Sequence, residues 1–447
     1  MRKFNYKFLF HLFFSLFLLS LPFSKGVTST VYVVLLIFSA FRIIQKKWHT
    51  NTVDQSTSLK NVKKILLLPS LLFLALSGSL LYSDNITTGL EELISQSKII
   101  GIPLIFYANL LLIHKRYYGY VNMLIRAVSI AVGITFILFL LPDSIVQQIT
   151  DLVGMKEYVI HEKKAAFGAY SPFVDRLQFS YLIVLATFLE LWIIFHLAAG
   201  QRLPYFFKNS TLILLLVGLI ILGARGAQLG FILGMSIWLI GVFYQYGYPH
   251  LKNKWGGSVA ILIGAIGLLV STIMVPFIAY KTIPNIQTRY NQMTWELGTF
   301  QDGTYKNYDY THFTSVRRLL SWKHTWNLIQ KQPILGVGIG DYEQTMETIY
   351  QKEQLQFPVN THNQYLYYWA AGGVLALGAF MVMCLYWLYQ CASAEKYWTT
   401  ILSRAFLVFY FLVFLLDAPL NYQVGAMTFW VGYSMISIPL FERFSFK

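Results

Sequence analysis

The chain has 447 residues, of which 56% are hydrophobic and only 12% are charged. Soluble domains are usually about one-quarter charged, so this composition argues against an ordinary soluble protein. The formal net charge of +15 would suit a nucleic-acid-binding protein. However, most of the basic excess lies in short segments between apolar runs, with no basic domain, so we expect no nucleic-acid partner.

The apolar residues come in runs of about 17 to 25, the length at which a helix crosses a bilayer. We therefore predict an all-α polytopic membrane protein with about twelve transmembrane helices. The first run lacks a convincing cleavage site and is predicted to be a retained helix. Glycines and a charge in LGARGAQLG divide the segment 210–246 into two spans. The predicted spans are 8–22, 27–44, 64–82, 98–113, 124–142, 177–199, 210–223, 226–246, 257–280, 364–390, 402–416 and 424–441.

Lysine and arginine are distributed unequally between the alternating gaps that separate these spans. One set of gaps contains only three acidic residues, Asp54, Glu395 and Glu442. The basic residues of the same set are Arg2, Lys3, Lys7, Arg42, Lys46, Lys47, Lys60, Lys63, Lys64, Lys115, Arg116, Arg126, Arg202, Lys208, Lys252, Lys254, Lys396, Arg404, Arg443 and Lys447. Because cytoplasmic loops are rich in Lys and Arg, this set is predicted to be cytoplasmic, together with both termini.

Two gaps on the opposite side are long, at about 143–176 and 281–361. The second is far longer than a connection between helices requires, and long ordered loops are often functional. Within it, VRRLLSWKHTWNLIQK (316–331) predicts an amphipathic helix with Leu319, Leu320, Trp322, Trp326 and Ile329 as its apolar positions. Such a helix would lie on the membrane face or cover a cavity.

The chain is accordingly divided into four parts. Residues 1–209 form the first six transmembrane helices, and 210–280 form the next three with the Arg-Gly motif. Residues 281–361 form the large outer loop, which is predicted to be partly helical. Residues 362–447 form the last three transmembrane helices.

Four charged or titratable residues near the outer ends of spans are candidates for chemistry. Arg225 lies between Gly223 and Gly226, and an arginine within a bilayer is costly unless it has a function, although it could also extend to the interface. Arg317 and Arg318 start the amphipathic helix, where they could bind phosphate or form a solvated basic face. His362, where the loop re-enters the membrane, could transfer a proton or form an interfacial hydrogen bond.

Other motifs give weaker signals. GVGIG (336–340) lacks the spacing of a nucleotide-binding fingerprint and is interpreted as a flexible turn after Pro333. There is no DxD, CxxC or HExxH pattern, so we predict neither a metal site nor a cofactor.

The order of these segments resembles that of the O-antigen ligase and O-antigen polymerase superfamily. GARGAQLG ends a span and a large loop follows, with a tryptophan four residues after Arg318. Then come QPILGVGIGDYE and THNQYLYYWAAGGVLALGAF, which enters the next span. The resemblance covers roughly residues 210–385, and each single motif is less specific than the ordered set.

The resemblance implies metal-independent, inverting transfer of a glycan from an undecaprenyl-pyrophosphate carrier. The acceptor would be lipid A–core, at the periplasmic face of a bacterial inner membrane. By motif, Arg225, Arg318 and His362 match the catalytic residues of the family. Arg317, Trp322 and Gln228 lie in the same motifs and are assigned to substrate binding, while the register between Arg317 and Arg318 stays open.

Other functions fit the same sequence. A polymerase would use a second lipid-linked repeat unit as acceptor, and a protein glycan transferase would use a protein hydroxyl. A flippase or carrier would explain the many spans and the polar groups Glu190 and His196 within one of them. It would not explain the large loop with its paired arginines.

The charge distribution leads to a test of topology. Reporter fusions after residues 50, 120, 205, 253 and 397 should report the cytoplasm, because these positions lie in the Lys- and Arg-rich gaps. Fusions near 90, 160 and 310 should report the periplasm. Alkaline phosphatase and green fluorescent protein activities measure the two locations. A cytoplasmic signal at position 310 would contradict both the topology and an outward-facing site.

Overall fold

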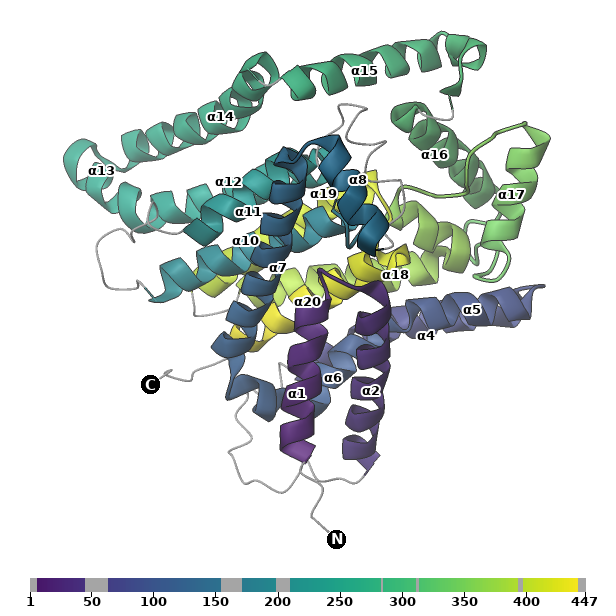
Figure 1. Cartoon of the computed structure of the whole chain (residues 1–447), viewed down its shortest axis with the longest axis horizontal. Coiled ribbons are helices and arrows are strands. Elements are labelled where there is room, and N and C mark those ends of the chain that lie inside the picture. Colours follow the sequence, from purple (N-terminus) through teal and green to yellow (C-terminus); the bar gives the residue numbers. More distant parts are fainter. Residues whose placement is uncertain are drawn as a thin grey trace.

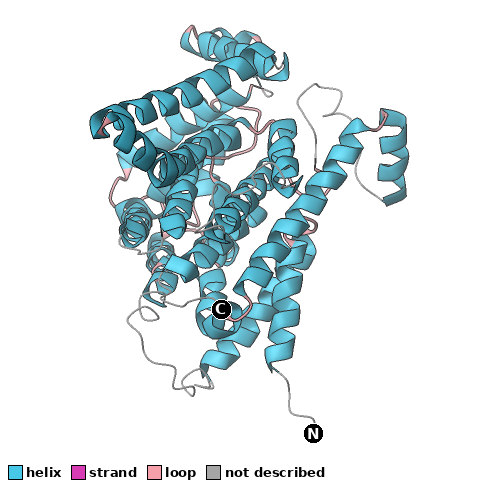
Figure 2. Cartoon of the chain, turned by 90° about the vertical axis from the view of Figure 1, so that its left-hand side faces the viewer, coloured by secondary structure: helices cyan, strands magenta, loops and turns pink. Residues whose placement is uncertain are grey.

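The described part of the chain is built mainly of helices. The computed structural model describes residues 6–44, 63–153, 171–197, 210–282, 284–310, 313–392 and 397–440. No strand occurs in these ranges, and Figure 2 shows helices throughout. The predicted all-α polytopic class is confirmed.

The apolar helices account for each predicted span. The main ones are α1 (Tyr6–Ser20), α2 (Lys25–Ile44), α4 (Pro69–Ser79), α6 (Lys98–His114), α7 (Tyr117–Leu140), α10 (Arg176–Leu197), α11 (Ser210–Leu222), α12 (Arg225–Val242), α14 (Gly257–Thr282), α18 (Gln364–Ala392), α19 (Tyr397–Leu416) and α20 (Gln423–Leu440). Shorter elements between them are η1 (Leu80–Tyr82), α5 (Ile86–Gln96), α8 (Asp143–Val153), the π-helical turn η3 (Phe243–Gly247), α13 (Tyr248–Trp255) and η6 (Pro419–Asn421).

Eight helical segments in the described ranges are long and apolar enough to cross a membrane. They are Lys25–Ile44, Lys63–Tyr82, Ile86–His114, Tyr117–Leu140, Arg176–His196, Arg225–Lys254, Gln364–Gln390 and Tyr397–Leu416. The helices α1 and α11 are apolar but shorter. The chain is thus a multi-pass membrane protein, and the number of twelve crossings stays a prediction.

The break at 223–225 separates α11 from α12, as the glycines predict. Gly223 has a φ of +60°, which favours glycine, and the chain reverses direction there. The helix α12 packs along α19, where a Cβ on Gly230 would lie 3.1 Å from the carbonyl oxygen of Phe409. Small residues allow such close approach between membrane helices, so this packing fixes the start of α12, where Arg225 lies.

The large loop is partly helical, as predicted. It contains α15 (Pro284–Gln301), η4 (Thr304–Asn307), α16 (Thr314–Lys331) and α17 (Tyr342–Lys352). In Figure 1, α14 and α15 run across the top of the view, while α16 and α17 lie at its right. The helix α15 contacts α14, η4 and α16, and α16 contacts α18 in turn.

The predicted amphipathic helix is confirmed as α16, but its buried face differs from the prediction. Leu320 and Ile329 are buried, whereas Trp326 is 43% exposed. The buried face also contains Ser321 and Thr325. These hydroxyl groups hydrogen-bond tyrosines of α17, so polar contacts replace part of the expected apolar stripe.

GVGIG is part of a tightly bonded loop that inserts into a break in α18. In a regular helix, Val374 N–H would donate to the carbonyl oxygen of Ala370. Here Val374 N–H donates to Ile334 O (3.0 Å), and Ala370 O accepts from Val337 N–H (2.8 Å). The loop thus satisfies both groups that the break leaves open, as non-helical backbone near a membrane requires.

The other side of this loop is bonded to the start of α5. Asp341 accepts the backbone N–H groups of Asp84 (2.7 Å) and Asn85 (2.9 Å). Gly340 N–H donates to Ser83 Oγ at 3.2 Å. The expectation of a flexible turn is therefore wrong, because the loop is fixed between α18 and the α4–α5 connection.

Gly373 allows a test of this loop. Its φ of +65° and ψ of −164° suit only glycine, and a Cβ would lie 2.0 Å from Ile334 O. We expect Gly373→Ala to destabilise the protein by roughly 2–4 kcal/mol, from strain and lost hydrogen bonds, and to lower the thermal unfolding midpoint in detergent. Gly378→Ala, in the same helix with open space around it, is the control and should change stability by under about 1 kcal/mol. Equal midpoints for the two variants would contradict this account.

Candidate functional site

Arg225 begins α12 directly after the reversal of the chain. Ala224 precedes it in an extended conformation, so Arg225 is the first helical residue. Its Nη2 donates to Thr314 Oγ1 at 2.8 Å. Thr314 is the first residue of α16, and this bond brings the Arg-Gly motif into contact with the large loop.

Arg318 lies on the first turns of α16 and is central to the cluster. Its positive charge acts on three other groups of the site. These are the side chains of Arg225, His362 and Asp417. The register between Arg317 and Arg318 stays a prediction, since the charges of both arginines act on His362.

Arg317 lies on the same turn but has a different environment. Its guanidinium lies over the ring of Phe357, 5.2 Å from the centroid. A cation over an aromatic face is stabilised by the ring quadrupole. Its charge also acts on His362, so both arginines belong to the positive region beside that histidine.

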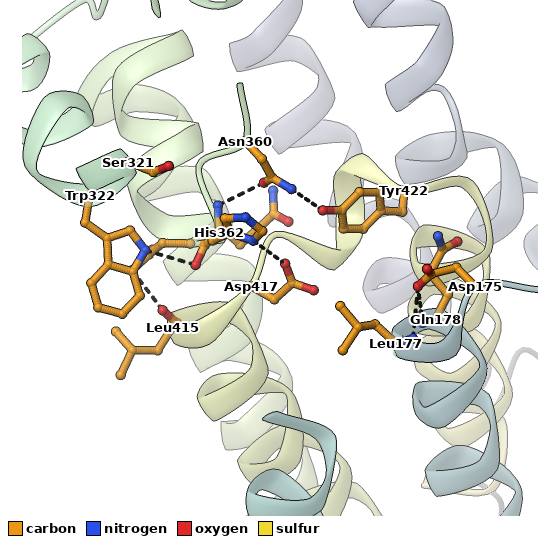
Figure 3. Close-up of polar contacts among 12 residues, drawn as sticks. Asp175, Leu177, Gln178, Ser321, Trp322, Asn360, His362, Leu415, Asp417 and Tyr422 are labelled. Atoms are coloured by element: carbon orange, nitrogen blue, oxygen red, sulfur yellow. Dashed lines mark hydrogen bonds and ion pairs between the residues drawn. The ribbon is translucent and has the colours of Figure 1, made fainter. Parts of the chain in front are cut away.

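Trp322 connects α16 to the segment that carries His362. Its Nε1–H donates to the carbonyl oxygen of His362 at 3.1 Å, as Figure 3 shows. Trp322 lies one helical turn after Arg318, so the two side chains are neighbours on α16. In this structure, Trp322 therefore positions His362.

His362 has a φ of +48°, which is uncommon for a residue other than glycine. Its N–H donates to Asn360 Oδ1 (2.9 Å), and Asn360 Nδ2 donates to the hydroxyl of Tyr422. The Tyr342 hydroxyl pairs with Thr361 Oγ1 at 2.5 Å. Flanking bonds thus hold His362 in a conformation that local preferences disfavour, which is common at functional sites.

Asp417 is the partner of the His362 ring and is not among the residues predicted from the sequence. The ring Nδ1 lies 3.4 Å from Asp417 Oδ1, and the Tyr181 hydroxyl donates to Oδ2 at 2.7 Å. Asp417 is only 3% exposed and follows the last residue of α19. With Nδ1 directed at the carboxylate, Nε2 of His362 is left to accept a proton.

Both groups of this pair lie outside the membrane-spanning segments, and the environment shifts their pKa values. Burial lowers the pKa of His362 below its ordinary value, although the hydrogen bond and charge of Asp417 oppose this shift. Burial alone would raise the pKa of Asp417, but the hydrogen bond with His362 and nearby positive charge outweigh it and hold the pKa below its ordinary value. The pair therefore consists of a carboxylate and a neutral imidazole near pH 7.

The structure brings together most, but not all, of the predicted residues. Hydrogen bonds join Arg225 and Trp322 to α16 and to the segment of His362, while Arg317 and Arg318 lie on α16 close enough for their charges to act on His362. Gln228 instead donates from Nε2 to the carbonyl oxygen of Leu219 at 3.1 Å, which ties α12 to the end of α11. This gives Gln228 a structural role, and its contact with substrate stays a prediction.

The remaining histidines of the large loop are not equivalent to His362. His324 is buried, and its Nε2 lies 3.6 Å from Glu353, on the side of α16 that packs against α17. His312 lies outside the described residues. Among the described residues, no group of three or more His, Cys, Asp or Glu side chains is arranged to hold a metal ion.

The cluster combines a positive region with a proton acceptor. Two chain reversals bring it together, one at Gly223 and one between α19 and α20. Figure 3 shows the second of them beside the N-terminus of α10. Guanidinium groups bind phosphate oxygens through a planar fork of donors, and a neutral histidine next to a carboxylate acts as a general base. The arrangement is suited to a reaction in which an anionic group leaves and a hydroxyl loses its proton.

Comparison with known proteins agrees with this geometry. Residues 210–381 match the sequence profile of the O-antigen ligase family, a range that includes Arg225, the large loop and His362. No curated protein matches the chain significantly. Residues 210–381 are therefore similar to the O-antigen ligase family, which confirms the superfamily resemblance of these motifs.

Proposed function

We propose that this chain transfers a glycan from an undecaprenyl-pyrophosphate carrier to the lipid A–core of lipopolysaccharide, at the periplasmic face of the bacterial inner membrane. The observation that carries the proposal is the convergence of Arg225 and Arg318 with the His362–Asp417 pair, within a domain of the O-antigen ligase family. The glycan-transfer class follows from the domain, and donor, acceptor and mechanism belong to the proposal.

The proposed step is a single displacement at the anomeric carbon of the first donor sugar. The acceptor hydroxyl oxygen forms the new bond to this carbon, while the bond to the diphosphate oxygen breaks. The electron pair leaves with the polyprenyl diphosphate, and the hydroxyl proton moves to Nε2 of His362. Asp417 stabilises the imidazolium that results.

Arg225 and Arg318 act on the leaving group in this scheme. As the glycosidic bond breaks, negative charge grows on the diphosphate oxygens, and fixed cations stabilise that state more than the ground state. The arginines supply this charge themselves, so we expect transfer without a divalent cation or an external nucleotide.

The environment of Asp417 supports inversion at the anomeric carbon. A retaining reaction requires a carboxylate that attacks this carbon. Asp417 is buried, with one oxygen facing His362 and the other accepting from Tyr181. It is therefore positioned to orient the base, which fits one displacement with inversion.

The acceptor is the least constrained part of the proposal. A polymerase that joins lipid-linked repeat units would use the same residues, and so would a transferase for protein hydroxyls. A deletion strain separates these activities on a gel of surface glycans. Loss of all long-chain glycan from lipid A–core supports a ligase, whereas a single repeat on the core supports a polymerase.

The proposal is tested by transfer from a lipid-linked glycan with purified protein in nanodiscs, in buffer with EDTA. Wild-type protein should be active. We expect kcat to fall by about 10²- to 10⁴-fold in each of three variants, Arg225→Ala, Arg318→Ala and His362→Ala, because each removes transition-state stabilisation or the base. Arg318→Lys should recover only part of the activity, since lysine lacks the planar fork.

Arg317→Ala is the matched comparison for Arg318→Ala. Its kcat should fall less than that of Arg318→Ala, because the Arg317 guanidinium is stacked on Phe357. Dependence on added magnesium would contradict metal-independent transfer. Full activity of all three main variants would leave the carrier function as the better interpretation.

The pair of His362 and Asp417 also predicts a pH dependence. Only neutral His362 accepts a proton, and burial lowers its pKa, so the acidic limb of kcat/KM should lie below the ordinary histidine value of about 6.5. Asp417→Asn removes the charge that raises the pKa of His362. The limb should therefore move to still lower pH, while the plateau falls by about 10²-fold or more. A limb that stays in place or moves upward would contradict the coupling.

A further inference from the structure

Glu296 is a fully buried acid on α15 that the proposed chemistry does not use. Its side chain has no exposed surface. Oε2 accepts the backbone N–H of Ser315 at 2.7 Å, and Oε1 accepts Gln292 Nε2 at 2.9 Å. A buried carboxylate is costly unless it is hydrogen-bonded, so these two bonds explain how it is tolerated.

The bond to Ser315 closes the start of α16. The first four N–H groups of a helix have no partner within the helix and are usually capped by a nearby Ser, Thr, Asp or Asn. The N-cap residue of α16 is Phe313, whose side chain cannot accept a hydrogen bond from the helix. Glu296 supplies this cap from another helix, where its negative charge also suits the positive end of the helix dipole.

Glu296 is also close to the arginines. The negative charge of Glu296 attracts Arg225. Arg318 and Arg176 are positively charged and repel Arg225. Bringing like-charged guanidinium groups into one region of low polarity is unfavourable, and a nearby carboxylate offsets part of that repulsion. Glu296 therefore acts on both ends of the contact between Arg225 and Thr314.

We propose that Glu296 is a positioning residue that holds the N-terminus of α16, so that Arg318 and Arg225 face the same diphosphate group. The inference rests on the proposed function for the identity of that group. Its basis is the bond to Ser315 next to Thr314, which accepts from Arg225. Arg318 lies three residues after Ser315, so a tilt of the first turn would displace its guanidinium.

Glu296 is not placed to contact substrate. Both of its oxygens are occupied, and its side chain is shielded from solvent. It also provides a side-chain contact from α15 to α16. Movement of α15 would thus be transmitted to the arginines through this carboxylate.

Two conservative variants separate hydrogen bonding from charge. Glu296→Gln keeps the length and an oxygen acceptor for Ser315 but removes the charge. Glu296→Asp keeps the charge but withdraws it by one methylene group, which breaks the bond to Ser315. Glu296→Ala removes both, and Glu347→Gln, at an exposed glutamate of α17, is the matched control.

The variants are measured in nanodiscs by transfer kinetics and by binding of inorganic pyrophosphate, followed as thermal stabilisation. Positioning predicts that Glu296→Gln stays within about threefold of wild type in kcat/KM and in pyrophosphate affinity. Glu296→Asp and Glu296→Ala should lose at least about tenfold in both, since small displacements of catalytic groups are costly. The acidic limb of the pH profile should not move in any variant.

Opposite results overturn the inference. An active Glu296→Asp with an inactive Glu296→Gln would mean that charge alone matters, and a shifted acidic limb would assign Glu296 to proton transfer. Wild-type kinetics and binding in Glu296→Ala would remove any role. If the Glu296→Ala protein is absent from the membrane, the comparison of Glu296→Gln with Glu296→Asp tests the positioning role. If wild type binds pyrophosphate but transfers no glycan, the proposed function fails, while the binding series still tests Glu296.

Discussion

The position of α16 is the constraint on which the candidate site depends. This helix is held at its start by Glu296 and by Arg225 through Thr314. Its middle is held by the bond from Trp322 to the carbonyl oxygen of His362. Its end leads into the loop that inserts into the break in α18. A helix in an extramembrane loop would otherwise move relative to the membrane domain, and these three attachments make it part of one rigid site.

Charge explains why so many attachments are needed. Arg318 repels Arg225 and acts unfavourably on a protonated His362, so the cluster does not assemble by its own attraction. Asp417 and Glu296 place negative charge near the arginines, and each is hydrogen-bonded and buried. Because Arg225, Arg317 and Arg318 outnumber these two acids, the cluster stays net positive. In the absence of a ligand this is unfavourable, and an anionic ligand would relieve it.

The sequence predicts those residues that lie next to a recognisable boundary. Arg225 follows a glycine break, Arg318 starts an amphipathic segment, and His362 precedes a span, so local pattern was enough to find them. Asp417 lies 55 residues after His362, and its signal is one acid between two apolar runs, which does not identify its partner. The buried face of α16 was mispredicted because Ser321 and Thr325 are satisfied by tyrosines of α17, a tertiary contact that periodicity does not contain.

The range of the family match shows how the site is divided along the chain. Residues 210–381 contain the arginines and His362, but Tyr181 and Asp417, which orient the histidine, lie on either side of that range. The connection that fixes the GVGIG loop, around Ser83 and Asp341, also joins the matched range to the N-terminal helices. The range that matches the ligase family therefore does not contain every residue of the cluster. The arginines and His362 lie within it, whereas Tyr181 and Asp417, which hold the His362 ring, lie outside it.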